Sequence, residues 1–438
     1  MSDALPQGWS DVRLGAIGSF VRGRGGTKSD EWPNGLPCIR YGELYTRHDC
    51  IVRDFYSFIS PASTSAYTPL RSGDVIFAAS GETLDEIGKA AAYCGTDAAY
   101  AGADTVIFRP ADPLDPRFVG YAVNSLAANQ HKSRMGQGSS VMHISAEQLG
   151  RLPLRLPPLH QQQRIAEILT TIDEAIEQTQ GLIEKTQQIK TGLMHDLFTR
   201  GVMPNGQLRP TREEAPQLYK ESPLGWVPRE WTPDAFGSRV NIIDPNPSHR
   251  YPEAQETGVP ICSTENFCGE DAFDLSTSKF VLADVLVAQR ERCHFAADDV
   301  IFARKGRIGL ARRYGTEPKV FSHTVVILKA RAPKADQQWL LWVSRSHWLL
   351  NGIDKRMNSN SGVPTLGVEL IDSVAVPFPE IDEQQRINSR LNEISQRLAV
   401  EADHLAKLRQ LKSGMMQDLL TGRVRVQVTN VQAVSAHV

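Results

Sequence analysis

The sequence lacks the patterns that mark secreted, membrane-spanning or zinc-stabilised proteins. Its six cysteines are scattered, with no CxxC pair and no histidines at matching spacing: Cys38, Cys50, Cys94, Cys262, Cys268 and Cys293. Buried free thiols are therefore favoured over disulfides or a zinc site. The N-terminal stretch MSDALPQGWSD has no basic-then-apolar signal region, and no apolar run is long enough to span a bilayer. We expect a cytoplasmic protein with no membrane partner.

Enzyme signatures are also missing. The glycines of GETLDEIGKA are too widely spaced for a phosphate loop, and Ala follows Lys89 where Ser or Thr is required. The Asp-Pro-Asn-Pro at 244–247 lacks the aromatic residue of an adenine methyltransferase motif. Asp299, Glu317 and Lys319 have nuclease-like spacing, but so short a pattern arises by chance and the first half has no counterpart. We expect no catalytic residues, no metal site and no cofactor.

Length and charge set broad limits. A chain of 438 residues exceeds one typical hydrophobic core, so two or more domains are expected. The formal net charge is −2, with 48 Lys and Arg against 50 Asp and Glu. A near-neutral total does not exclude nucleic-acid binding, because a local basic surface is what matters.

The chain contains two copies of one long segment. Residues 160–201 read HQQQRIAEILTTIDEAIEQTQGLIEKTQQIKTGLMHDLFTRG, and residues 382–423 read DEQQRINSRLNEISQRLAVEADHLAKLRQLKSGMMQDLLTGR. Aligning Gln162-Gln163-Arg164 with Gln384-Gln385-Arg386 also superposes Asp196-Leu197 on Asp418-Leu419 without a gap. The chain is therefore a tandem duplication.

Each copy predicts one long amphipathic helix of about 58 Å at 1.5 Å per residue, because proline is absent and apolar residues recur at heptad spacing. In the first copy, Ile165, Ile172 and Leu193 share one heptad position and Ile168, Leu182 and Ile189 the other, with Thr179 and Thr186 interrupting the seam. In the second copy, Ile387, Ile394, Leu408 and Met415 alternate with Leu391, Leu398, Leu405 and Leu411. So narrow a stripe favours an intramolecular coiled coil. Packing of each helix on its own globular neighbour is the alternative, but it leaves the extended polar faces unexplained.

Other motifs also recur. Gly8-Trp9 has a counterpart in Gly225-Trp226, and we expect both Trp residues to anchor a turn to a core. SGDVIFAASGETLDEIG (72–88) matches ADDVIFARKGRIG (297–309), and the apolar VIF segments predict buried strands. KSRMGQGSSVMH (132–143) aligns with DKRMNSNSGVPT (354–365) without a gap, so that Arg134 falls on Arg356. Each half therefore repeats strands, a polar loop and a long helix.

These features predict an α+β protein of two pseudo-symmetric halves, each a mixed α/β domain followed by a long helix. The expected divisions are a mixed domain over 1–156, a helix over 157–200, a linker rich in proline, glycine and charge over 201–221, a second mixed domain over 222–378, a second helix over 379–424 and a tail over 425–438.

Polar, basic and glycine-containing loops occur at equivalent places in the two halves. In the first half the candidate residues are Arg22, Arg24, Lys28, Arg40, Tyr41, Ser80, Lys132, Arg134, Gln137, Ser139 and Ser140. In the second half they are Arg250, Arg304, Lys305, Arg307, Lys355, Arg356, Asn358, Ser359, Asn360 and Ser361. Arg and Lys neutralise phosphates or contact guanine, whereas Asn and Gln contact adenine. Any single loop is more often a solvated turn, but the repetition favours double-stranded DNA as the ligand.

In this order, the motifs resemble the specificity subunit of type I restriction-modification systems. The resemblance covers nearly the whole chain and rests on the Gly-Trp pairs, the GDVIF and DDVIFARKG strands, the Gln-Gln motifs that begin both long helices, and the helix ends at 194–201 and 416–423. Each motif is weak alone, but their repeated order is specific.

The resemblance implies two target recognition domains that bind the halves of a split DNA site, with an antiparallel coiled coil that sets the spacer between them. It also implies docking of two methyltransferase subunits and of restriction subunits. S-adenosylmethionine, ATP and magnesium then belong to these partners, and this chain is not catalytic. Because the two loop sets differ, for example VRGRGGTKSD against VNIIDPNPSHRYPE, the expected site is asymmetric.

Two alternatives stay open at this stage. A stand-alone DNA-binding regulator would bind its sequence tightly without a methyltransferase. A coiled-coil interaction scaffold would bind no DNA even with that partner.

Overall fold

A computed structural model describes residues 5–26, 28–84, 86–111, 113–138, 141–248, 250–357 and 366–426. The chain forms two compact units. Unit 1 comprises Met1–Gln180 with Asp403–Val438, and unit 2 comprises Gly181–Ala402. The two longest helices, α5 (Leu159–Thr199) and α10 (Ile381–Thr421), each contribute one segment to both units. Each unit therefore contains sequence from both halves of the duplication.

Unit 1 contains a mixed α/β domain built on a four-stranded antiparallel sheet in the order β2-β10-β6-β8. These strands are β2 (Gly18–Arg22), β10 (Thr105–Pro110), β6 (Val75–Ala78) and β8 (Ala90–Ala92). A second sheet contains β4 (Ser57–Ile59), β3 (Glu31–Ile39), β9 (Tyr100–Ala101) and β5 (Thr68–Pro69), and β1 (Ser10–Arg13) pairs with β12 (Pro153–Leu156). The remaining elements are β7 (Ser80–Gly81), β11 (Met142–His143), η1 (Leu14–Ala16), η2 (Lys28–Asp30), η3 (Pro61–Ala66), α1 (Tyr41–Thr46), α2 (Pro116–Val123), α3 (Leu126–Met135) and α4 (Ala146–Gly150).

Unit 2 repeats this plan with the sheet order β16-β24-β21-β22. The strands are β16 (Val240–Ile243), β24 (Val325–Ala330), β21 (Val300–Ala303) and β22 (Ala311–Arg313), and β15 (Thr232–Ala235) pairs with β25 (Ala375–Phe378). The smaller strands are β13 (Tyr219–Ser222), β14 (Gly225–Pro228), β17 (Val259–Cys262), β18 (Phe267–Cys268), β19 (Ala272–Phe273), β20 (Phe280–Val281) and β23 (Val320–Phe321). The helices are η4 (Pro216–Leu218), η5 (Phe236–Ser238), η6 (Thr264–Asn266), α6 (Ala283–Cys293), α7 (Gln337–Ser344), α8 (His347–Asp354) and α9 (Val368–Ser373).

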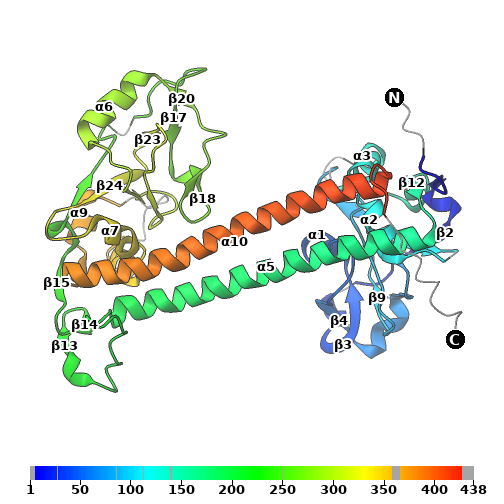
Figure 1. Ribbon diagram of the computed structural model, residues 1–438, viewed down its shortest axis with the longest axis horizontal. Helices are drawn as coiled ribbons and strands as arrows, with labels where there is room; N and C mark the ends of the chain where they lie inside the picture. Colours follow the sequence, from blue (N-terminus) through cyan, green and yellow to red (C-terminus); the bar gives the residue numbers. More distant parts are fainter. Residues whose placement is uncertain are drawn as a thin grey trace, which may run out of the picture. The chain divides into compact units, whose positions relative to one another are not determined.

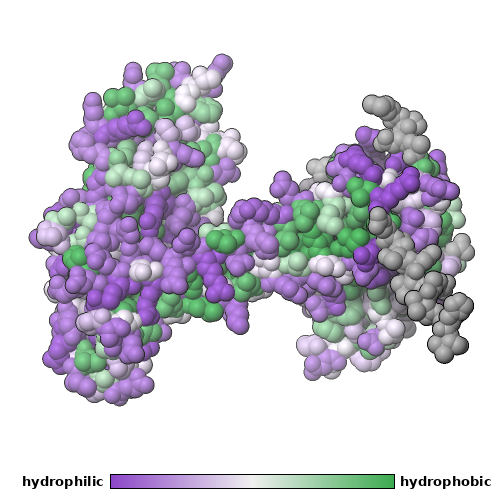
Figure 2. All heavy atoms as spheres, in the orientation of Figure 1, coloured by the Kyte–Doolittle hydropathy of each residue, from purple (hydrophilic) through white to green (hydrophobic). Residues whose placement is uncertain are grey.

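The two VIF segments form fully buried central strands, as predicted. Both are apolar at every position because the sheet is covered on both faces. One face of β6 contributes Val75 and Phe77 to the core that includes α2 and α5, whereas Ile76 faces a second cluster. The part of the chain that the structure describes has no helix both long and apolar enough to cross a membrane. Figure 2 shows a mainly hydrophilic face on unit 2, with apolar residues in separate patches.

In each unit, the segments of α5 and α10 pack side by side in opposite directions (Figure 1). In unit 1, Leu169 near the start of α5 shares a hydrophobic core with Leu419 near the end of α10. In unit 2, Leu197 near the end of α5 lies in one core with Ile387 near the start of α10. The expected antiparallel pairing of the two long helices is thereby confirmed.

Thr179 and Thr186, which were expected to interrupt the seam, are buried in it. Each hydroxyl donates a 2.7 Å hydrogen bond to the carbonyl oxygen one turn earlier, of Ala175 and Leu182 respectively. Because this local bond satisfies the hydroxyl, the side chain can face the neighbouring helix.

The prediction was wrong for Ile189 and Leu411, whose side chains are 53% and 54% exposed. The next residues, Lys190 and Lys412, lie in the protein interior instead, with side chains only 2% and 12% exposed. The apolar periodicity identified the helix but not every residue that faces inward, because it assumes that inward-facing residues are apolar.

The Gln-Gln motif that begins each long helix attaches that helix to the mixed domain preceding it. Gln162 accepts a hydrogen bond from the backbone N–H of Asp115 (3.1 Å) and donates one to the carbonyl oxygen of Pro157 (2.8 Å). Gln384 makes the same two bonds, with Asp336 (2.9 Å) and Pro379 (2.8 Å). Asp115 and Asp336 are themselves the N-caps of α2 and α7. Two buried glutamines therefore have one structural role in the two units.

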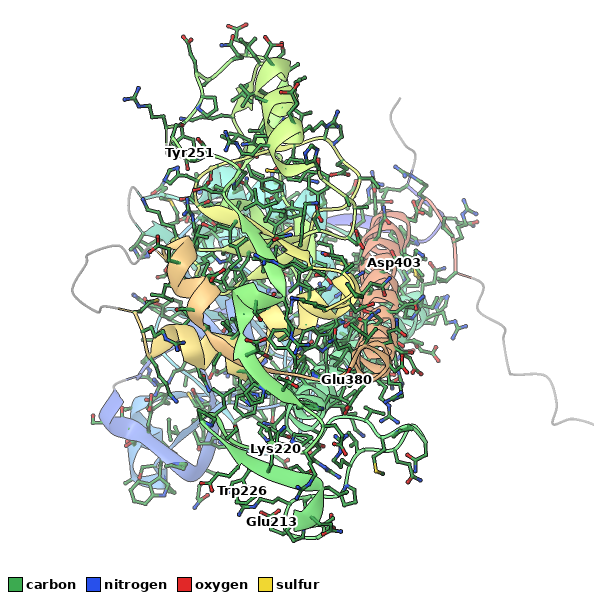
Figure 3. All side chains as sticks on the ribbon, turned by 90° about the vertical axis from the view of Figure 1, so that its left-hand side faces the viewer. Glu213, Lys220, Trp226, Tyr251, Glu380 and Asp403 are labelled. Atoms are coloured by element: carbon green, nitrogen blue, oxygen red, sulfur yellow. The ribbon has the colours of Figure 1, made fainter. Side chains whose placement is uncertain are left out.

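The proposed correspondence of Trp9 with Trp226 was wrong. Trp9 precedes β1 and donates to Gln161 (2.8 Å), whereas Trp231 precedes β15 and donates to Glu383 (3.0 Å), which aligns with Gln161. Trp226 instead lies exposed on hairpin β13–β14, at the opposite end of unit 2 from Tyr251 (Figure 3). The Gly-Trp dipeptide misled the alignment because it recurs on the hairpin, whereas Glu230 precedes Trp231.

The predicted linker, residues 201–221, is part of unit 2 and packs on the start of α10. Arg209, within it, is buried and donates to both carboxylate oxygens of Glu383, at 3.1 and 3.3 Å. Glu383 also accepts from the backbone N–H of Val202 (2.8 Å). This buried ion pair fixes the chain segment after α5 to the first turn of α10.

We predict that Gln384→Ala lowers the free energy of unfolding by about 1–3 kcal/mol, because it leaves the buried Asp336 N–H and Pro379 carbonyl without partners. Urea denaturation should show a lower midpoint with an unchanged m-value. The matched control is Gln385→Ala, at an exposed neighbouring position, which should leave the midpoint unchanged. Equal midpoints for the two variants would contradict this role for Gln384.

Candidate nucleic-acid interface

One edge of the main sheet in unit 1 gathers several predicted residues. Strand register places the end of β2 at Arg22, the end of β6 at Ala78 and the start of β10 at Thr105 on this edge. Ala79 then donates from its backbone N–H to the carbonyl oxygen of Asp104 (2.8 Å). The following residues form β7, which pairs with β11 at the end of the polar loop. Loops distant in sequence therefore meet at one sheet edge.

These loops surround a groove of about 640 Å³. Its polar lining includes three of the predicted residues, Arg22, Ser80 and Gln137, together with Asp104, His143 and Arg151. The Ser80 hydroxyl lies 3.0 Å from Nδ1 of His143. A cation, amides, a hydroxyl and an imidazole around one groove supply the donors and acceptors that base edges and phosphates require.

Sequence reasoning did not select Asp104 and Arg151, which lie beside candidate loops, or His143, which ends the polar loop outside its basic run. Asp104 gives one detectable structural signal, a positive φ of 57°. This rare conformation turns the chain immediately before β10. Neither the sequence nor the backbone conformation singles out His143 or Arg151.

Arg40 is a second anion-binding candidate in unit 1. One of its terminal nitrogens pairs with Glu31 (2.7 Å), whereas Nε and Nη2 are buried without a hydrogen-bond partner in the described structure. Buried donors without acceptors are uncommon, and a phosphate oxygen would satisfy them. The predicted residues Arg24 and Tyr41 are exposed.

Unit 2 builds the same sheet edge with different side chains. The backbone N–H groups of Arg304 and Lys305 donate to Thr324 (2.9 and 3.2 Å), as Ala79 does to Asp104. Val21 in unit 1 and Ile243 in unit 2 pair with equivalent residues of the neighbouring strands, so the next residue is Arg22 in unit 1 and Asp244 in unit 2. The backbone frame is therefore repeated, but an aspartate that pairs with Arg304 replaces Arg22.

Two of the predicted contacts, Lys132 and Arg304, are corrected by burial. The Lys132 side chain is 0% exposed, and its ammonium donates to the carbonyl oxygen of Gly88 (2.6 Å). Arg304 is 4% exposed and donates to Asp244 (2.7 Å) and to the carbonyl oxygen of His323 (2.9 Å). Ser80 is buried as well, although it lines the groove. Lys132 and Arg304 therefore support the fold, because their charged groups are buried and bonded within the protein.

The other candidates in unit 2 are at or near the surface. Arg307 is exposed and donates to the carbonyl oxygen of Phe267 (2.7 Å), and Lys305 is half-buried. Arg250, Lys355 and Arg356 are exposed, as is Arg134 in unit 1. Ser139, Ser140, Asn358, Ser359, Asn360 and Ser361 lie outside the described residues, as does the side chain of Lys28. These residues stay predictions.

The nuclease-like spacing of Asp299, Glu317 and Lys319 does not form a site. Asp299 pairs with Lys329 (2.5 Å). The Lys319 ammonium donates to the backbone carbonyl oxygens of Tyr314 (2.8 Å) and Glu317 (2.9 Å). Within the described residues, no group of three or more His, Cys, Asp or Glu side chains is arranged to hold a metal ion.

Comparison with known proteins shows similarity to specificity subunits of type I restriction enzymes. Residues 6–188 match the family model described as the type I restriction modification DNA specificity domain. The type I restriction enzyme MjaVIII specificity subunit of Methanocaldococcus jannaschii is 22% identical over 432 residues, covering 97% of this chain and 95% of that protein. The putative type I restriction enzyme MjaX specificity subunit of the same organism is 22% identical over 434 residues, with the same coverage of both chains.

Solved structures share the fold. The S subunit of a type I restriction-modification system from M. genitalium superposes with a TM-score of 0.58 at 15% identity, covering 96% of this chain and 97% of that one. A chain from a study of complex assembly and conformational transition in the type I R-M system gives a TM-score of 0.54 at 19% identity, covering 96% and 100%.

We predict that Arg22→Ala weakens binding to double-stranded DNA a few-fold and reduces the slope of log K against log salt by about one, because one phosphate contact is lost. Fluorescence anisotropy across a salt series measures both quantities. Arg53→Ala is the matched control, since this exposed arginine lies outside the groove and pairs with Glu177. An unchanged salt slope for Arg22→Ala would remove Arg22 from the interface.

We predict a pH-dependent stability contribution from Lys132. Burial lowers the pKa of its ammonium to about 7, below the ordinary value of a lysine. Between that pKa and about 10.4 the unfolded chain binds more protons than the folded chain, so stability rises with pH. The free energy of unfolding of the wild type relative to Lys132→Met should rise by up to about 1.4 kcal/mol per pH unit from pH 7 to 10. A difference that does not vary with pH would contradict a buried, titrating Lys132.

Proposed function

We propose that the chain is a member of the type I restriction modification DNA specificity family, whose model its residues 6–188 match, and that it selects the DNA sequence on which a methyltransferase and endonuclease complex acts. It recognises DNA and does not itself catalyse methylation or cleavage. The observation that carries the proposal is that the two units repeat one backbone arrangement with different side chains. The same sheet edge occurs in both units, with Arg22 at a position in one that Asp244 occupies in the other.

Each mixed domain is proposed to bind one half of a bipartite DNA site. Arginine donates to guanine or phosphate, whereas a carboxylate accepts from cytosine. In addition, unit 1 has an open groove where unit 2 has an Arg304–Asp244 ion pair. Different chemistry at equivalent places supports two different half-sites, and therefore an asymmetric target.

The long helices are proposed to set the spacer between the half-sites. α5 and α10 have the same length of 41 residues each. A helix has a fixed rise per residue. Bases between the half-sites are then spanned without being read, and their number is constant.

The proposed partners follow from the family. The two relatives from Methanocaldococcus jannaschii are named as specificity subunits of type I restriction enzymes, and we propose that two methyltransferase subunits and the restriction subunits dock on this chain. S-adenosylmethionine, ATP and magnesium are then bound by those partners, and this chain binds none of them. We also propose that the complex acts on cellular DNA in the cytoplasm.

Mapping of N6-methyladenine in cells that carry this chain with its methyltransferase tests the proposal. We expect one asymmetric, bipartite motif with a spacer of constant length. Cells with the methyltransferase alone are the control and should lack this motif. A palindromic motif, or none, would contradict the proposal.

Purified protein separates the alternatives. Gel filtration and DNA binding should be measured with and without the methyltransferase subunit. Tight, sequence-specific binding by the chain alone would favour a stand-alone regulator. A complex that forms but does not bind DNA would favour an interaction scaffold.

A further inference from the structure

Each long helix buries one lysine at the same place in the duplication. Aligning Gln162-Gln163 with Gln384-Gln385 places Lys190 of α5 on Lys412 of α10. Both lie beside the mixed domain of a unit, but in each case that domain belongs to the other half of the sequence. Lys190 follows the first mixed domain and contacts the second, whereas Lys412 follows the second and contacts the first.

In unit 1, Lys412 is enclosed by two carboxylates and a ring. Its ammonium pairs with Asp49 of the mixed domain and with Asp173 of α5 (2.6 Å). It also lies 5.8 Å from the ring centroid of Tyr121, on α2. The Tyr121 hydroxyl donates to the same Asp173 (2.6 Å). The lysine therefore joins α10, α5 and the mixed domain in one polar network.

In unit 2, Lys190 occupies an equivalent cluster. Its ammonium pairs with Glu270 of the mixed domain and lies 4.8 Å from the ring of Trp342, on α7. Arg345 also pairs with Glu270 (3.1 Å) and with Asp271, and lies over the Trp342 ring at 5.2 Å. Both clusters thus combine a helix lysine, a carboxylate of the mixed domain and an aromatic ring on the helix that Asp115 or Asp336 caps.

Burying a lysine between two packed helices costs free energy, because its charge loses hydration. An apolar side chain would pack without desolvating a charge, so a buried ion pair is weak evidence for added stability. What a buried charge does supply is a directional requirement, because only one placement of the carboxylate satisfies it. The adjacent apolar residues, Ile189 and Leu411, are left exposed instead. The same arrangement in both copies points to a role in placement.

We propose that Lys190 and Lys412 are positioning residues, each of which fixes a recognition domain onto the long helix supplied by the other half of the chain and thereby sets how that domain engages its half-site. The inference rests on the proposed function for its DNA arm. The buried glutamines hold each domain to its own following helix, and the lysines add the attachment to the second helix.

The two clusters differ at one informative position. Asp173 in unit 1 aligns with Ser395 in unit 2, whose hydroxyl is buried without a hydrogen-bond partner in the described structure. Burial and the nearby Arg345 lower the pKa of Lys190 to about 8. Burial also acts to lower the pKa of Lys412, but Cys50, Asp49 and Asp173 raise it above its ordinary value. Unit 2 therefore lacks the helix carboxylate that unit 1 has.

Two variants of the full-length chain test the proposal in complex with the methyltransferase. DNA duplexes should carry the mapped target with either half-site replaced. We expect Lys190→Met to reduce discrimination at one half-site about tenfold and Lys412→Met to reduce it at the other half-site, because removal of one member of a buried pair is strongly disruptive. Lys185→Met and Lys407→Met, at exposed positions on the same helices, should change neither. Loss at the same half-site, at both or at neither would overturn the inference.

Hydrogen exchange on the chain alone distinguishes failure of this inference from failure of the proposed function. Lys190→Met should accelerate amide exchange around β18 and β19, and Lys412→Met should do so at 48–51, each about tenfold and without effect on the other region. This result supports the attachments even if the wild-type complex binds no DNA. Unchanged exchange in both variants overturns them.

Moving the carboxylate partner of Lys190 from the mixed domain to α10 tests whether Lys190 positions the domain or only needs a counter-charge. Glu270→Gln should lower the melting temperature and reduce discrimination at the Lys190-dependent half-site. Adding Ser395→Asp places a carboxylate where Asp173 pairs with Lys412, on the helix and not on the domain. We expect the double variant to recover the melting temperature but not the discrimination. Recovery of both would show that Lys190 needs only a counter-charge and would overturn the positioning role.

Discussion

The fold depends on the need of each long helix for a partner. A helix with a narrow apolar stripe is not stable alone in water, and most of its stability comes from packing. Here the partner is the other copy of the same segment, running in the opposite direction in both units. Because each unit contains sequence from both halves, neither unit is complete in one copy of a single half of the duplication. The tandem repeat is therefore one interdependent structure and not two independent domains.

Polar residues, more than apolar ones, specify how each mixed domain meets its helices. Gln162 and Gln384 satisfy the backbone N–H groups of Asp115 and Asp336 in the same way. Glu383 joins Trp231, Arg209 and Val202 at the start of α10. Such groups must be paired when buried, so they permit few alternative arrangements. An apolar contact would tolerate a shifted or rotated domain far more readily.

The candidate DNA surfaces show how a duplicated frame can acquire two specificities. The backbone bonds at the sheet edge are retained in both units, whereas the side chains that project from them differ in charge. In unit 1, Arg22 borders an open groove. In unit 2, Asp244 holds Arg304. Loops can change in this way because a rigid sheet holds their ends.

Much of this protein could be predicted from its sequence. The duplication, the buried VIF strands and the two helices follow from local patterns of apolar residues, which reflect backbone periodicity and need no knowledge of distant contacts. The family resemblance also rests on short motifs in a repeated order. Of the candidate site, the sequence indicated Arg22, Ser80 and Gln137, which do lie around one groove.

Only the tertiary structure decided which polar residues face inward. Lys190 and Lys412 are buried in preference to Ile189 and Leu411 because distant carboxylates, Glu270 and Asp49, neutralise them. Lys132 and Arg304 are buried away from the predicted interface because the carbonyl oxygen of Gly88 and the carboxylate of Asp244 accept their hydrogen bonds. Periodicity along one chain determines that a helix exists, but the cost of burying a charge depends on groups brought close by folding, and these are not adjacent in the sequence.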